Sequence, residues 1–109
     1  GLPLEQALTL WATVLSRPSA RRIVCDAGWK YHGYHPTLSQ PLRLPGAARL
    51  AFSAEHLTLD CETDIAAFAV GERIEFAVGY ADSTVFLHRE LFAMRHGAIE
   101  EVLPLPTRP

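Results

Sequence analysis

Lysine is nearly absent from this chain of 109 residues, since it occurs once, at position 30, against nine arginines. An excess of positive charge is also missing, because the formal net charge is −2, and this argues against the basic surface by which proteins bind nucleic acid. No apolar run reaches the length of a membrane span, and no signal peptide is visible. The sequence therefore predicts a partner that is neither nucleic acid nor membrane.

Cysteine is scarce as well, and its two positions exclude several kinds of site. Cys25 and Cys61 lie 36 residues apart and form none of the short spacings that bind zinc or perform redox chemistry. We expect two buried thiols in a cytoplasmic protein rather than a disulfide. The composition is 49% apolar and 20% charged, as in an ordinary globular protein, and the length suits one domain over residues 1–109.

Short apolar runs between turn signals predict an all-β fold. The β-branched and aromatic content of residues 7–16 favours a strand with both faces covered, although a helix is an alternative. In the run 73–77 we expect Ile74 and Phe76 to point inward, and His96-Gly97 is typical of a two-residue hairpin turn. Further strands are expected at 21–26, 50–53, 57–61, 91–95 and 98–103. Six to eight short strands indicate a small β-barrel or a sandwich.

Residues 29–49 lack regular periodicity and contain three prolines. A segment of this length in a compact domain is usually a lid, an insertion or a contact surface. It includes His32 and His35, which we interpret as a surface contact or part of a pocket wall, because no histidine of the chain has metal-ligand spacing.

The stretch 78–88 contains the clearest candidate site. If it is extended from Tyr80 to His88, side chains alternate between its faces, and Tyr80 and Asp82 share one face with residues 84, 86 and 88. An aspartate in such a place can ligate a hard cation or hold a polarised water. The competing interpretation is a polar strand end that faces solvent.

Other titratable residues lie where strands end. Glu55 and His56 can donate protons or orient a metal ligand, or they form a structural pair whose glutamate accepts backbone hydrogen bonds. Asp26 precedes Gly28, a residue free to take positive φ, and the simpler interpretation is a turn capped by this carboxylate. Lys30 is a conceivable Schiff-base nucleophile, but we expect an exposed lysine in a loop.

The order of four motifs resembles a known family. The sequences VLSRPSARRIVCDAGWK, SAEH, VGERIEF and GYADSTVFLH follow one another as in the C-terminal domain of the D-serine dehydratase / D-threonine aldolase-like family. These enzymes use pyridoxal phosphate and form the fold-type III group with alanine racemase. The resemblance implies that this chain is a small β-barrel domain, and the C-terminal part of a longer chain. A preceding TIM-barrel domain then holds the cofactor and its Schiff-base lysine.

The resemblance also implies a site. In the family, zinc or manganese beside the cofactor is held by a Pro-x-His-x-Cys/Asp-x-Thr stretch, which aligns with residues 78–84. Asp82 matches the second ligand and Thr84 the threonine, whereas Tyr80 stands where the histidine ligand would be. A phenol with a pKa of about 10 is a poor metal ligand, so either the metal is lost or Asp82 holds it with other groups. We expect Tyr80 to donate to the substrate's β-hydroxyl or to relay a proton.

The expected function is therefore that of a barrel domain in a pyridoxal-phosphate-dependent lyase that acts on D-β-hydroxy amino acids, as a dehydratase or an aldolase. Its catalytic candidates are Tyr80, Glu55 and His56, and its candidate metal ligand is Asp82. We expect a homodimer, and no activity from the isolated domain. The alternative is a non-catalytic β-barrel module for binding or oligomerisation.

Overall fold

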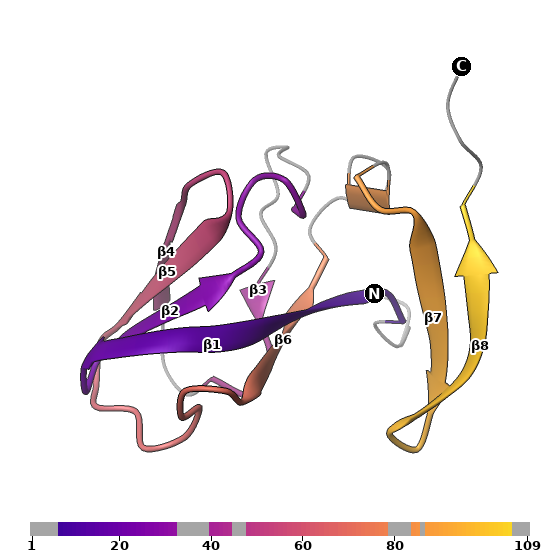
Figure 1. Ribbon diagram of the computed structural model, residues 1–109. Coiled ribbons are helices and arrows are strands. Elements are labelled where there is room, and N and C mark those ends of the chain that lie inside the picture. The colour runs from indigo at the N-terminus through magenta and orange to yellow at the C-terminus, as the bar shows by residue number, and fades with distance from the viewer. Residues whose placement is uncertain (1–6, 33–39, 45–47, 79–83, 86, 106–109) are drawn as a thin grey trace, which may run out of the picture.

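The computed structural model describes residues 7–32, 40–44, 48–78, 84–85 and 87–105 (Figure 1). Its eight strands are β1 (Thr9–Ser19), β2 (Arg22–Asp26), β3 (Gln40–Pro41), β4 (Ala48–Phe52), β5 (His56–Cys61), β6 (Arg73–Ala77), β7 (Glu90–Arg95) and β8 (Ala98–Pro104). Six form an antiparallel sheet in the order β3-β6-β1-β2-β5-β4, which curls into a half-barrel, while β7 and β8 form a separate ribbon (Figure 1). The prediction of an all-β domain is confirmed.

Alternation of side chains along the strands builds the core on the inner side of the curled sheet. In β6, Ile74 and Phe76 are fully buried, as predicted, while the residues between and beside them are more exposed. Strand β5 repeats the pattern, with Leu57 and Leu59 fully buried. Because a strand has a side-chain period of two, such a sequence buries one face and leaves the other toward solvent.

Strand β1 confirms the prediction of a strand at residues 7–16, but the prediction that both of its faces are covered is wrong. Ala12 and Val14 are buried, whereas Trp11 is 41% exposed and Leu15 is 45% exposed. A curled sheet encloses only its inner side, and the β7–β8 ribbon leaves a groove of about 700 Å³ between itself, β1 and β6. The guanidinium of Arg73 covers part of this outer surface, 5.6 Å from the centre of the Trp11 ring.

Two turn predictions have different outcomes. The His96-Gly97 hairpin is confirmed, since both residues have positive φ (50° and 78°) and connect β7 to β8, which is the backbone of a type I′ turn. The segment 29–49 is less irregular than predicted, because Gln40 and Pro41 form β3 and pair with β6. Pairing with an existing strand can order two residues that show no periodicity of their own.

The prediction of two buried free thiols is confirmed. Cys25 and Cys61 are free thiols, and both are buried. Burial raises the pKa of the Cys25 thiol to about 12, with a smaller contribution from the charge of Asp26. A neutral, buried thiol packs as a small apolar side chain. Within the described part of the chain, no helix is long and apolar enough to cross a membrane.

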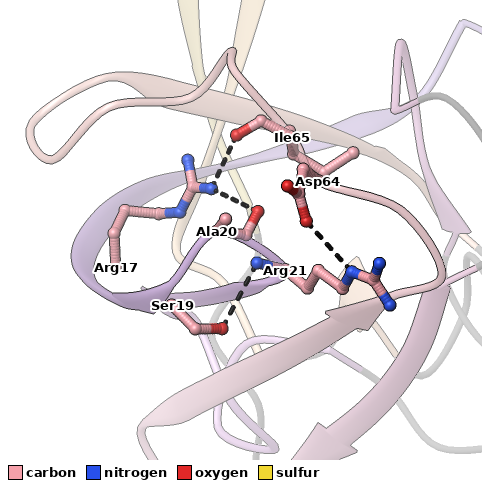
Figure 2. A network of polar contacts seen from close by, with 6 residues as sticks. All are labelled: Arg17, Ser19, Ala20, Arg21, Asp64 and Ile65. Carbon is pink, nitrogen blue, oxygen red and sulfur yellow. Dashed lines mark hydrogen bonds and ion pairs between the residues drawn. The ribbon is translucent and has the colours of Figure 1, made fainter.

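Arg17 joins the β1–β2 turn to the loop that follows β5. Its guanidinium donates hydrogen bonds to five carbonyl oxygens, at distances of 2.8–3.2 Å, on Ala20, Arg22, Ile65, Ala67 and Phe68. Figure 2 shows two of these bonds beside the exposed Arg21–Asp64 ion pair. The planar, five-donor guanidinium suits this arrangement, and a lysine ammonium cannot reproduce it.

We expect Arg17→Met to lower the free energy of unfolding by about 1–3 kcal/mol, because several carbonyls lose a charged donor at once. Arg17→Lys should recover only part of this loss. Urea unfolding measures the effect, with Arg21→Met as the control, since an exposed ion pair contributes little. Equal stability of the Arg17→Met and Arg21→Met variants would show that the hydrogen bonds of Arg17 to these carbonyls do not stabilise the fold.

Candidate functional site

The described candidate residues lie on two loops that are hydrogen-bonded to each other, and a third loop contacts the first. The first loop follows β2, the second joins β4 to β5, and the third follows β6 and leads to β7. We call their described residues, 26–32, 53–56, 84–85 and 87–88, the rim. Loops that join the strand ends of a rigid sheet are where proteins commonly place functional groups.

The first two loops are joined backbone to backbone. Trp29 N donates to Ser53 O at 2.8 Å, and Lys30 N donates to Ala54 O at 3.0 Å. A Cβ added at Gly28 would lie 2.1 Å from Ser53 O, so this close approach requires glycine. The expected positive φ occurs one residue earlier, at Ala27 (72°). Gly28 is therefore needed for space, and the prediction that assigned it a turn conformation is corrected.

Asp26 spans two strands instead of capping its own turn. Its Oδ1 accepts a hydrogen bond of 2.7 Å from the backbone N–H of Thr13 on β1. Thr13 lies just beyond Val14–Cys25, the last register pair between β1 and β2. The carboxylate thus extends the connection between these strands toward the rim, and this contact corrects the local-cap interpretation.

Glu55 and Lys30 form an ion pair of 2.6 Å across the first two loops, and both side chains are largely exposed. The hydrogen bond to Glu55 raises the pKa of Lys30, and the same bond lowers the pKa of Glu55. At neutral pH, Lys30 is therefore a protonated, exposed loop residue, as expected, and Glu55 is ionised. Beside them, His56 is exposed, and its backbone closes the turn with Ser53.

The third loop does not continue as a strand. Leu87 N donates to Thr84 O (3.0 Å) and His88 N donates to Val85 O (3.1 Å), which are bonds of a tight turn. The prediction of an extended segment is therefore wrong for the described residues 84–85 and 87–88. Alternation over a few residues does not by itself distinguish a strand from successive turns. Tyr80 and Asp82 lie outside the described residues, between Val78 and the buried Thr84.

His88 connects the third loop to the first. Its Nε2 lies 2.8 Å from the carbonyl oxygen of Tyr31, and the two rings are 6.0 Å apart. Since a carbonyl only accepts, Nε2 carries the hydrogen and donates it. Sequence reasoning missed this contact, because 57 residues separate the partners and neither lies in a recognisable spacing.

Comparison with known proteins identifies the family. The sequence model of the putative serine dehydratase domain matches residues 7–94. The chain belongs to this family. This confirms the resemblance inferred from the order of the four motifs.

Two proteins that are similar to this chain are aldolases. The chain is 28% identical over 107 residues to a D-threonine aldolase from Arthrobacter sp. This alignment covers 98% of the chain and 28% of that protein. The chain also matches the crystal structure of D-threonine aldolase from Filomicrobium marinum with a TM-score of 0.80 and 32% identity, over 88% of this chain and 27% of that one. The chain thus spans little more than a quarter of the length of these relatives.

The described part of the chain supplies neither a set of converging metal ligands nor a lysine suited to hold the cofactor. Among the described residues, no three His, Cys, Asp or Glu side chains converge as metal ligands. Lys30 is protonated and paired with Glu55, which is unsuitable for attack on a carbonyl. The described residues therefore do not fit either group.

His32 is a rim residue that sequence reasoning placed wrongly. It was expected in a surface contact or a pocket wall, but it is 1% exposed. Its ring packs edge to face with Phe52 and Phe76 in the core. Burial, with a smaller contribution from the charge of the nearby His88, lowers the pKa of His32 to about 4. At neutral pH the ring is therefore uncharged.

Proposed function

We propose that this chain is the β-barrel domain of a pyridoxal-phosphate-dependent lyase that acts on D-β-hydroxy amino acids, by aldol cleavage or by elimination of the β-hydroxyl. The observation that carries the proposal is the likeness to D-threonine aldolases over nearly the whole chain. Because the chain spans 28% of such a relative, the proposal assigns the cofactor to another part of the protein. The bound cofactor supplies an electron sink for the substrate.

In this proposal, the segment between β6 and Thr84 borders the reaction chamber. Tyr80 holds the substrate's β-hydroxyl or moves its proton, and Asp82 orients that hydroxyl or a water beside it. Both reaction outcomes require a polarised β-hydroxyl. The anchors on either side support this role, since Val78 N donates to Leu8 O (3.4 Å) and His88 donates to Tyr31 O (2.8 Å). Glu55 and His56 are supporting candidates on the exposed side of the rim.

Turnover by the full-length natural protein tests this function. We expect activity on D-threonine or D-serine, and a loss in kcat of about 10²–10⁴-fold in Tyr80→Phe, because a positioned proton donor or acceptor contributes this much. Asp82→Asn should lose activity in the same range. Asp64→Asn is the matched control, because Asp64 forms an exposed ion pair with Arg21.

Three results would contradict parts of the proposal. Absence of turnover on every D-β-hydroxy amino acid would reject the lyase. Undiminished kcat in Tyr80→Phe would reject the role of the phenol. Stoichiometric, tightly held zinc or manganese in elemental analysis would show that Tyr80 has not replaced part of a metal's role.

The proposal includes a homodimer. The β7–β8 ribbon supports it, and it also supports the alternative of an oligomerisation module. The β7–β8 ribbon exposes Phe92 (55%), Ile99 (56%) and Val102 (45%), and Phe92 and Val102 are register partners. An isolated two-stranded ribbon is marginally stable in water, so cover by a second copy would stabilise it. Light scattering of Phe92→Ser, compared with the unmodified protein, should show the dimer weakened.

A further inference from the structure

The imidazole of His32 occupies an apolar place in the core without hydrogen bonds. Its ring centre lies 5.4 Å from that of Phe52 on β4 and 5.3 Å from that of Phe76 on β6. Neither ring nitrogen has a hydrogen-bond partner within the described part of the chain. Buried polar side chains nearly always have one, and a charged ring here would bury two N–H donors with little to replace their hydration.

The groups around the ring would not compensate a positive charge. Phe52 and Phe76 face it from the sheet, the backbone of Ala27 from its own loop, and His88 from the third loop. His88 opposes protonation, whereas a polar contact with the backbone of Ala27, too poor in geometry to count as a full hydrogen bond, favours it. No carboxylate acts on the ring among the described residues. Cation–π attraction to the two phenyl rings offsets only part of the lost hydration.

His32 is also the residue by which the first loop enters the core. Tyr31 N and His32 N both donate to Gly28 O, at 3.0 and 3.2 Å, and fold the loop into a turn. Trp29 stacks on the same Phe52 ring, with centroids 4.3 Å apart. The position of the loop therefore depends on one aromatic cluster that contains a titratable ring.

We propose that His32 is a proton-sensitive latch for the rim. The neutral ring stays between Phe52 and Phe76 and holds the first loop against β4 and β6. When the ring takes up a proton from solvent, it leaves the apolar site for water, and the loop detaches from the sheet.

The direction of the pH dependence follows from the difference between the latched and released states. The released ring has the ordinary pKa of about 6.5, whereas burial lowers the pKa of latched His32 to about 4. The released state therefore binds more protons between these two values. The latch is fully effective above pH 6.5 and weakens as the pH falls toward 4.

Release of the first loop would affect the proposed site through Tyr31. The carbonyl of Tyr31 accepts the hydrogen bond from His88 (2.8 Å), so movement of the first loop removes one anchor of the third loop. This consequence for catalysis rests on the proposed function. The latch itself does not, and it can be measured without any turnover.

Hydrogen–deuterium exchange of the full-length natural protein, followed at residues 28–32 from pH 7 to 4.5, tests the latch. After correction for intrinsic exchange rates, we expect protection to fall about tenfold per pH unit below 6.5, the limit for uptake of one proton. His32→Leu should remove this dependence, because leucine fills the site without titrating. His96→Asn should keep it, since His96 is an exposed turn residue with positive φ, which asparagine tolerates.

Protection that is unchanged down to pH 4.5, or that falls equally in His32→Leu, would overturn the proposal. Should His32→Leu fail to fold, NMR titration of ¹³C-labelled histidine in the unmodified protein decides the matter. A His32 ring that titrates at pH 6 or above would overturn it, and one that titrates well below would support it. If the latch fails while turnover on D-amino acids at pH 8 persists, the proposed function is unaffected.

Discussion

Alanine at position 28 is expected to separate the first two loops of the rim and to lower the free energy of unfolding by about 2–4 kcal/mol. Its Cβ would lie 2.1 Å from Ser53 O and 2.6 Å from His56 N, and backbone atoms cannot turn aside as a flexible side chain can. The loops must move apart, which breaks the bonds that Trp29 and Lys30 donate. Two lost hydrogen bonds, with the strain of overpacking, account for this magnitude. Chemical denaturation measures the effect.

Gly97→Ala is the control that separates lack of space from backbone conformation. Gly97 has a φ of 78°, and a Cβ there would meet nothing within 4 Å. Its replacement should cost about 1–2 kcal/mol, the penalty of the left-handed region for an L-residue. Exchange measurements on the Gly28→Ala variant should show reduced protection at Trp29 and Lys30, whose N–H groups cross between the loops. Retained protection there would contradict the close-approach argument.

Phe76→Ala is expected to cost about 3–5 kcal/mol, because it empties a large site in the core that surrounding residues fill only partly. Phe76 is fully buried on β6, and its ring contacts the ring of His32. The variant should therefore also loosen the first loop of the rim. Urea unfolding gives the total effect, and exchange at residues 28–32 gives the local one.

Phe92→Ala makes the matched comparison for Phe76→Ala. Phe92 is 55% exposed on the β7–β8 ribbon, so within a single chain removal of its ring changes little buried surface, and the comparison is made on the monomer because Phe92 belongs to the proposed dimer contact. Phe76→Leu should fall between the two, since leucine retains most of the buried apolar volume. Similar losses for Phe76→Ala and Phe92→Ala would show that the inner side of the sheet is not the principal core.

The strands with strict alternation were the most predictable part of the fold. In β6 the period of two located the strand at residues 73–77 and identified Ile74 and Phe76 as its buried side chains. The same rule misled at the third loop, where Leu87 N and His88 N donate to carbonyls three residues earlier, as in a local turn. A period of two in the sequence indicates a strand because one face of a strand is buried. A short segment outside the sheet buries no such face, so alternation there does not indicate a strand.

The sequence indicated polar residues at the strand ends but not the contacts that they make. The sequence indicated Asp26, Lys30 and Glu55 as polar groups at strand ends, but it did not indicate that Asp26 binds Thr13 N or that Glu55 pairs with Lys30. The bond between His88 and Tyr31 was missed for the same reason. Each contact joins segments whose meeting depends on sheet order, and local spacing does not contain that order.

The sequence by itself determined an all-β chain, the positions of most strands, the free thiols and the family. These properties follow from local alternation, turn chemistry and the order of motifs, which are all readable along the chain. Tertiary structure alone decided that Gly28 is needed for space, that Trp11 stays exposed and that His32 lies buried between two phenyl rings. The physical reason is that space, exposure and the solvation of a charge depend on which distant segments surround a residue, and those neighbours exist only once the sheet has curled.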